Sequence, residues 1–162
     1  MNSGEDRRVA DFRRATLSLS DCPKPKATGD FWESVELQEH RAVIRLPDGY
    51  VSSAVRGLEK GWYHWRWPSG ATIRLHLQRT GGNYQGLGDS DRMCKTTIAG
   101  HSAQVQFSDG PKISSEGGPS VLGLEIAGFT SDTVQFWATA ESAFPDELDS
   151  LYAALLTLSP TT

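Results

Sequence analysis

The stretch from Gly61 to Gln78, GWYHWRWPSGATIRLHLQ, concentrates the side chains that could do chemistry. It holds three of the five tryptophans and two of the four histidines of the chain. Imidazoles transfer protons near neutral pH, guanidinium groups pair with carboxylates, and indole rings fill pockets or stack on planar groups. Because such chemistry depends on which side chains share a surface, the local fold decides what the stretch can do.

The Pro68-Ser69-Gly70 sequence in its middle predicts a hairpin with a three-residue loop and glycine in the left-handed conformation. This loop pairs residues whose numbers sum to 138, and side chains alternate between two faces. One face is apolar, and we expect it in the core under a C-terminal helix: Tyr63, Trp65, Trp67, Ile73, Leu75 and Leu77. The other face is the candidate partner-binding site: Lys60, Trp62, His64, Arg66, Arg74 and His76.

Two interpretations of this candidate site stay open. A solvated sheet face with a cross-strand Trp62–His76 pair would explain its residues without a ligand. A recognition surface would also explain them, because Trp and Arg are enriched among the residues that dominate binding energy at interfaces.

Other motifs do not indicate catalysis. The sequence lacks G-x-S-x-G, H-E-x-x-H, the phosphate-binding G-x-x-x-x-G-K-[ST] and G-x-G-x-x-G. The Gly-rich stretch Gly86-Leu-Gly88-Asp-Ser-Asp91 contains two carboxylates, Asp89 and Asp91, that could touch a cation. Calcium needs about six to eight oxygen ligands, so we interpret this stretch as a loop. We therefore predict no catalytic residue, no metal and no cofactor, although an active site built from distant segments would leave no motif.

The two cysteines, Cys22 and Cys94, match no metal-binding spacing, and we interpret them as two separate thiols. A disulfide between them would require an oxidising compartment. The N-terminal sequence MNSGEDRRVADFRR lacks the apolar segment of a signal peptide, and no apolar run approaches the ~18 residues of a membrane span. As the chain stands, this predicts a cytoplasmic protein. The alternative is an extracytoplasmic protein whose sequence is a processed mature form.

Charge is distributed unevenly along the chain. The net charge is −4, yet no Lys or Arg follows Lys112, and the acidic residues beyond it leave the first 112 residues with a net charge of +3. Such a dipolar layout favours docking by a preferred face.

Alternation of apolar and polar residues predicts three further strand pairs. Residues 34–47 form a hairpin if Glu39-His40 is its turn, and one side then carries Val35, Leu37, Ala42, Ile44 and Leu46. A loop at Gly100-His101, with glycine first as in a type II′ turn, gives a second hairpin. One of its faces carries Thr96, Ile98, Ala103, Val105 and Phe107, and the other carries Lys95, Thr97, Gln104 and Gln106. Residues 122–126 and 134–140 make the third pair, with Leu122, Leu124, Ile126, Val134, Phe136 and Ala138 inward.

The pattern becomes helical between Phe144 and Leu158. Pro145 suits a first helical turn, Asp146 and Glu147 suit the positive end of the helix dipole, and Ser159-Pro160 ends the pattern. Residues 9–20 are ambiguous between helix and strand. We expect residues 1–29 to be an extension with a Pro/Lys linker, and residues 30–162 to be one domain. Its predicted class is α+β, with a single antiparallel, strongly twisted β-sheet of hairpins packed against the C-terminal amphipathic helix.

The segment Ile44-Arg-Leu-Pro-Asp-Gly-Tyr50, the strand pairs in meander order and the final strand leading into a helix resemble the PsbP-like domains. The likeness spans about residues 30–158 and is one of layout, without a specific motif. It implies a non-catalytic accessory or binding protein of a larger complex, and it assigns no functional residue. The Trp-rich hairpin and the absent signal peptide depart from the exported members of that group.

Three functions follow from these observations. The favoured one is a non-catalytic accessory subunit that docks onto a larger protein assembly through the candidate site and its termini. Peripheral association with a membrane complex is compatible with this role. The second is a nucleic-acid or polyanion binder that stacks bases on Trp62, against which the acidic net charge argues. The third is a small-ligand binder or enzyme with a sheet–helix pocket that uses His64 and His76 for acid–base work.

Overall fold

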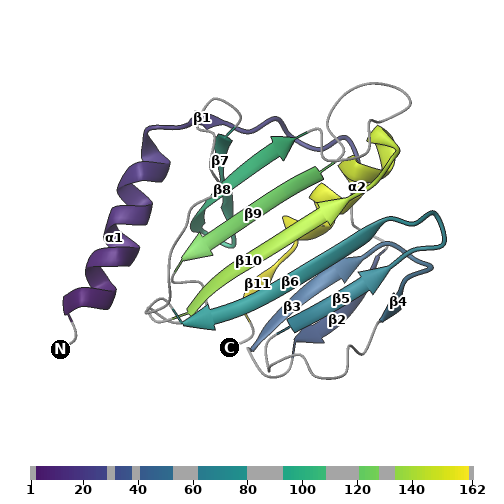
Figure 1. Cartoon of the computed structure of the whole chain (residues 1–162), viewed down its shortest axis with the longest axis horizontal. Helices are drawn as coiled ribbons and strands as arrows, with labels where there is room; N and C mark the ends of the chain where they lie inside the picture. The colour runs from purple at the N-terminus through teal and green to yellow at the C-terminus, as the bar shows by residue number, and fades with distance from the viewer. Residues whose placement is uncertain are drawn as a thin grey trace.

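The computed structural model describes residues 3–28, 32–37, 41–52, 62–79, 93–108, 121–127 and 134–160. In these ranges, strand is the predominant structure, arranged in two sheets with two helices (Figure 1). The elements in chain order are α1 (Ser3–Leu17), β1 (Ser20–Asp21), β2 (Glu33–Leu37), β3 (Ala42–Leu46), β4 (Val51–Ser52), β5 (Trp62–Arg66), β6 (Thr72–Arg79), β7 (Met93–Ile98), β8 (His101–Ser108), β9 (Val121–Ala127), β10 (Val134–Glu141), α2 (Pro145–Leu155) and β11 (Ser159–Pro160).

The predicted fold class is wrong, because the described strands form two sheets and not one. The larger sheet has eight strands in the order β1-β7-β8-β9-β10-β6-β5-β4, and it is mixed, since β1 pairs with β7 in parallel. The smaller sheet has the order β11-β3-β2. The β2–β3 hairpin cannot extend the larger sheet through β3, because β2 and β11 occupy both edges of that strand. The result is a mostly-β protein rather than one antiparallel sheet under a helix.

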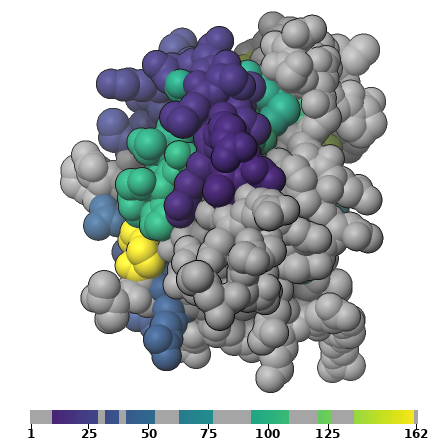
Figure 2. Space-filling view, turned by 90° about the vertical axis from the view of Figure 1, so that its left-hand side faces the viewer, coloured from purple at the N-terminus to yellow at the C-terminus, as the bar shows by residue number. Residues whose placement is uncertain are grey.

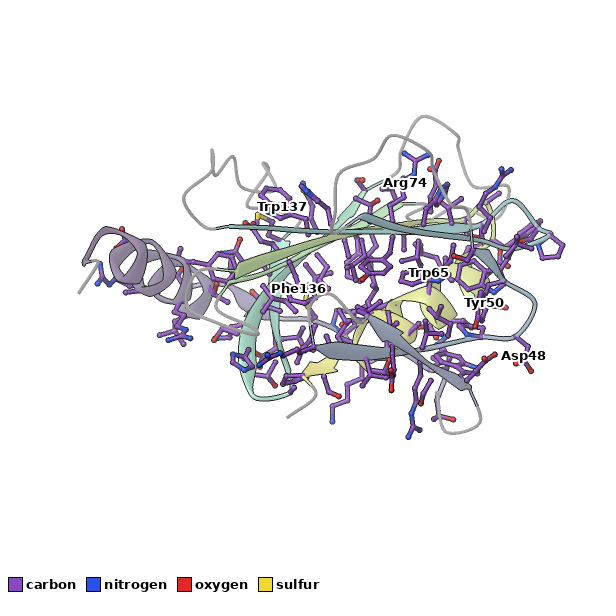
Figure 3. The ribbon with its side chains drawn as sticks, turned by 90° about the horizontal axis from the view of Figure 1, so that it is seen from below. Asp48, Tyr50, Trp65, Arg74, Phe136 and Trp137 are labelled. Carbon is purple, nitrogen blue, oxygen red and sulfur yellow. A yellow bond between two sulfur atoms is a disulfide. The ribbon has the colours of Figure 1, made fainter. Side chains whose placement is uncertain are left out.

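The core lies between the two sheets, with α2 in the same layer (Figure 3). Phe136 and Trp65 point into this space from the larger sheet, and α2 contacts β3, β9 and β10. The predicted helix is confirmed, with Pro145 in its first turn and buried Leu148 and Leu151 at helical spacing. Its apolar side therefore packs between two sheets, where the sequence suggested one.

The predicted register of the Trp-rich hairpin is confirmed. Trp65 pairs with Ile73 and both are buried, in agreement with a pairing sum of 138. Gly70 has a φ of +94°, and its N–H donates to the Trp67 carbonyl at 2.9 Å. A residue with a Cβ would be strained at this φ, so glycine suits the turn.

The other hairpins agree with prediction on faces but differ in one turn. Leu37 pairs with Ala42 as expected, while Glu39-His40 lies outside the described residues. Ile98 pairs with His101, so the loop is Ala99-Gly100, both with positive φ, and the predicted Gly100-His101 loop is wrong. Positive φ at both loop residues is typical of a type I′ turn. The pairing shifts by two residues, and every side chain keeps its predicted face because strands repeat every two residues.

The N-terminal segment is tied to the larger sheet. Residues 9–17 belong to α1, which settles the helix-or-strand ambiguity for them, and α1 lies against β7 and β8 (Figure 2). The interpretation of the cysteines as separate thiols is wrong, because Cys22 and Cys94 form a disulfide. The parallel register of β1 brings Cys22 beside β7, where its N–H donates to the Lys95 carbonyl at 2.8 Å.

The predicted Pro/Lys linker is hydrogen-bonded to α2. The N–H groups of Lys26 and Ala27 donate to the Asp149 carboxylate at distances between 2.9 and 3.1 Å. The Tyr152 hydroxyl donates to the Pro23 carbonyl at 2.8 Å. None of the described helices is both long and apolar enough to cross a membrane.

Candidate functional site

The candidate site lies on the outer face of the larger sheet, which we define as the side opposite the core. Side chains alternate along each strand, so Trp65 and Ile73 point inward while His64 and Arg74 point outward. Figure 3 shows this difference between the labelled Trp65 and Arg74. The hairpin register therefore places all of the described candidate residues on one face.

The six predicted site residues are described to different extents. Lys60 lies outside the described residues, and Trp62 belongs to β5 but its side chain is not described. The side chains of His64 and His76 are half-buried. Those of Arg66 and Arg74 are exposed.

His64 sits in a positively charged environment. It lies directly opposite Arg74 on β6, and Arg66 is the next outward-facing residue on its own strand. Burial lowers the pKa of the His64 imidazole, and the charges of Arg74 and Arg66 lower it further. Its Nε2 atom is buried and has no hydrogen-bond partner in the described part of the chain. The imidazole is consequently neutral near pH 7.

Arg66 and Arg74 are cations without a counter-ion in the described ranges. The ion pair found in those ranges joins Arg14 to Asp11 on α1 at 3.4 Å. Glu141, the acidic residue on the same face of β10, lies opposite Thr72 and forms no ion pair with the described cations. Exposed guanidinium groups in this state are available to an external anion.

Sequence reasoning missed Trp137 as a member of this surface. β10 lies beside β6 (Figure 1), and Trp137 pairs with His76 across the two strands. Successive side chains of a strand point to opposite faces, so the position of Trp137 next to the inward Phe136 could have assigned it to the outer face. Nothing in the sequence indicated that β10, some 60 residues later, would be the neighbour of β6.

Helix α1 covers the other half of the outer face, over β7, β8 and β9. Phe12 is only 4% exposed there. The buried Gln104 side chain donates to the Thr16 hydroxyl at 2.9 Å, and Lys95 Nζ donates to the Leu17 carbonyl at 3.1 Å. We call the remaining half, over β5, β6 and β10, the arginine face, with His64, Arg66, Arg74, His76 and Trp137 as its described members.

Two of the cavities that described residues line are in other parts of the fold. One of about 370 Å³ lies between the end of α1, the disulfide and α2, and includes Leu17, Cys22, Lys95 and Tyr152 in its lining. One of about 300 Å³ lies beside the start of α2 and includes Asp48, Trp67 and Glu147. Neither is lined by a predicted site residue. Within the described ranges, no group of three or more His, Cys, Asp or Glu side chains is placed to hold a metal ion.

No protein-family model matches this chain, and no curated protein matches it either. The arginine face must therefore be interpreted from its own geometry. Two guanidinium groups and a neutral imidazole suit electrostatic recognition of an anion.

Proposed function

We propose that the protein is a non-catalytic accessory subunit that docks onto a larger protein assembly through the arginine face. The observation that supports this most is the pair of exposed arginines, Arg66 and Arg74, which have no counter-ion among the described residues. Arginine at the centre of an interface contributes strongly to binding energy, and it pairs with carboxylates in a fixed geometry. The PsbP-like resemblance points to the same accessory role and stays a prediction.

The two other functions have weaker support. An acid–base enzyme would use His64 beside a carboxylate or a nucleophile, but Arg74 lies directly opposite His64 and Arg66 follows it on the same strand. A nucleic-acid binder usually carries a strongly basic surface, whereas this chain has a net charge of −4.

The test compares three forms of the tagged protein in pull-downs from extracts of the native source. We expect the wild type to retain a defined protein complex and the double variant Arg66→Ala/Arg74→Ala to lose it. Arg45→Ala is the matched control, because it removes an exposed charge from β3 in the other sheet. If the double variant retains the same proteins at the same salt concentration, the arginine face is not the docking surface. Retention of RNA or DNA that falls steeply with salt would favour the polyanion function instead.

We also propose that the protein works in an oxidising compartment, which is the alternative to the expected cytoplasmic location. The Cys22–Cys94 disulfide supports this, because such bonds persist outside the reducing cytosol. Alkylation of free thiols during isolation from the native source, followed by mass spectrometry, measures the oxidised fraction. A protein recovered with both cysteines alkylated would contradict the proposal.

A further inference from the structure

We propose that Arg66 and Arg74 bind two carboxylates of an extended acidic segment in the partner, spaced as in Glu-x-Glu, and that His64 strengthens this binding at lower pH. The inference rests on the proposed docking function and specifies what the arginine face recognises.

The spacing of the two arginines supports an extended ligand. Arg74 lies opposite His64, while Arg66 lies opposite Thr72, so the two arginines are diagonal neighbours across β5 and β6. Diagonal neighbours in an antiparallel pair are about 7–8 Å apart. Alternate residues of an extended chain lie on the same side and about 6.7 Å apart, at about 3.3 Å per residue. A Glu-x-Glu or Asp-x-Asp sequence therefore presents two carboxylates at nearly the same interval.

Charge complementarity also favours carboxylates. The like charges of Arg66 and Arg74 repel one another, and no described carboxylate forms an ion pair with either. A planar guanidinium can donate two parallel hydrogen bonds to a carboxylate, which fixes orientation as well as adding energy. Val51 on β4 pairs in register with Arg66, and its side chain is exposed, so Arg66 adjoins an apolar side chain that a peptide could also cover.

The protonation of His64 makes carboxylate binding at this site depend on pH. Among the described residues, the titratable or charged groups that face His64 are Arg66 on its own strand and Arg74 and His76 on β6, while β4 carries none. Bound carboxylates would offset the charges of Arg66 and Arg74, which disfavour the imidazolium. Protonation of His64 and carboxylate binding thus promote each other. Burial, the largest cause of the lowered pKa, remains in the complex, so less than one proton should be taken up for each ligand bound.

Calorimetric titration of the purified full chain with an alternating Glu-Ala peptide tests the inference. A Gln-Ala peptide controls for charge, and a Glu-Glu-Ala-Ala repeat of equal charge controls for spacing. We expect the Glu-Ala peptide to bind more tightly than both. Arg74→Ala should weaken its binding by about tenfold or more, the usual loss for a charge-assisted hydrogen-bonded pair, while Arg45→Ala should change nothing.

The pH part is tested with His64→Asn. Titrations of the wild type near pH 6 in buffers of different ionisation enthalpy should show proton uptake, and affinity should rise as the pH falls from about 7.5 to about 5.5. In His64→Asn the proton uptake at about pH 6 should be lost, and the affinity should no longer rise as the pH falls. Proton uptake that persists on peptide binding to His64→Asn would overturn the proposed role of His64 at lower pH.

Three other outcomes overturn the inference itself: no binding of the Glu-Ala peptide, equal binding of the Gln-Ala peptide, or binding that is independent of Arg66 and Arg74. Tighter, arginine-dependent binding of a single-stranded oligonucleotide would replace carboxylates with phosphates as the ligand and overturn it too. A native complex that needs both arginines, together with failure to bind acidic peptides, would leave the docking function intact and refute only the carboxylate specificity.

Discussion

Glu147 connects the Trp-rich hairpin to α2. One carboxylate oxygen accepts from the Ser142 hydroxyl and the other from the Ser69 hydroxyl, each at 2.7 Å. The carboxylate also lies in the first turn of α2, where the helix dipole favours negative charge. A single residue thus fixes the hairpin turn against the start of a helix almost 80 positions later in the sequence.

Glu147→Gln should lower the free energy of unfolding by about 1–2 kcal/mol, because two charge-assisted hydrogen bonds become neutral or are lost. Urea denaturation followed by tryptophan fluorescence measures the change. Asp146→Asn is the control, since this exposed residue of the same turn should cost only about 0.5 kcal/mol through the helix dipole. Equal losses in the two variants would show that the Ser69 and Ser142 contacts contribute nothing.

His64 should make the fold sensitive to mild acid. Its pKa is lowered in the folded protein, so the unfolded chain binds a proton more readily as the pH falls below about 6.5. The free energy of unfolding should therefore be fully maintained above that pH and decrease on going to about pH 5.5.

His64→Asn should reduce this decrease, as measured by urea denaturation of both proteins across the same pH range. Other titratable groups also contribute to the dependence of the wild-type unfolding free energy on pH. The difference between the slopes of the two proteins therefore gives the contribution of His64. Parallel curves for the two proteins would contradict the assignment.

At the scale of elements, α1 is held on the sheet by few contacts. Its buried side chains in the described part are Phe12 and Thr16, and its other side chains there are largely exposed. A helix of this length is only marginally stable in isolation, so its helicity depends on docking.

Phe12→Ala should therefore release α1 and raise the rate of tryptic cleavage after Arg13 and Arg14 by about tenfold or more, because several kcal/mol of burial are lost. Mass spectrometry of timed digests measures the rate. Leu17→Ala is the matched control on the same helix, since Leu17 is 68% exposed. Equal cleavage rates in the two variants would mean that Phe12 does not hold the helix.

At the scale of the whole molecule, the disulfide joins the N-terminal segment to a strand in the second half of the chain. Cys22 and Cys94 are 72 positions apart, and the link closes a loop that contains β2 to β6. Cross-linking a loop of this length stabilises the fold chiefly by limiting the freedom of the unfolded chain.

Reduction should lower the free energy of unfolding by about 4 kcal/mol, the value expected for closing a loop of this size. Urea denaturation with and without dithiothreitol measures the difference. The Cys22→Ser/Cys94→Ser variant should match the reduced wild type and should not respond to dithiothreitol. A change in the wild type below about 1 kcal/mol would show that the link adds little to stability.

Local sequence determined the hairpin faces and the C-terminal helix. The Pro-Ser-Gly turn set the register of β5 and β6, and the apolar spacing around Leu148 and Leu151 defined α2. Alternation also predicted the two faces of the β7–β8 hairpin correctly, although its turn was wrong, because a shift of two residues preserves the faces. These features depend on neighbours in the sequence, which is why the sequence alone could determine them.

Only the tertiary structure decided how these pieces combine. It placed β10 beside β6 and so added Trp137 to the arginine face; it joined β11 to β3, which separated the two sheets; and it brought Cys22 to Cys94. Each of these contacts joins residues more than 50 positions apart. Alternation along a strand specifies which side chains share a face, but not which distant strand will pair with its edge, because backbone hydrogen bonds are the same for every sequence.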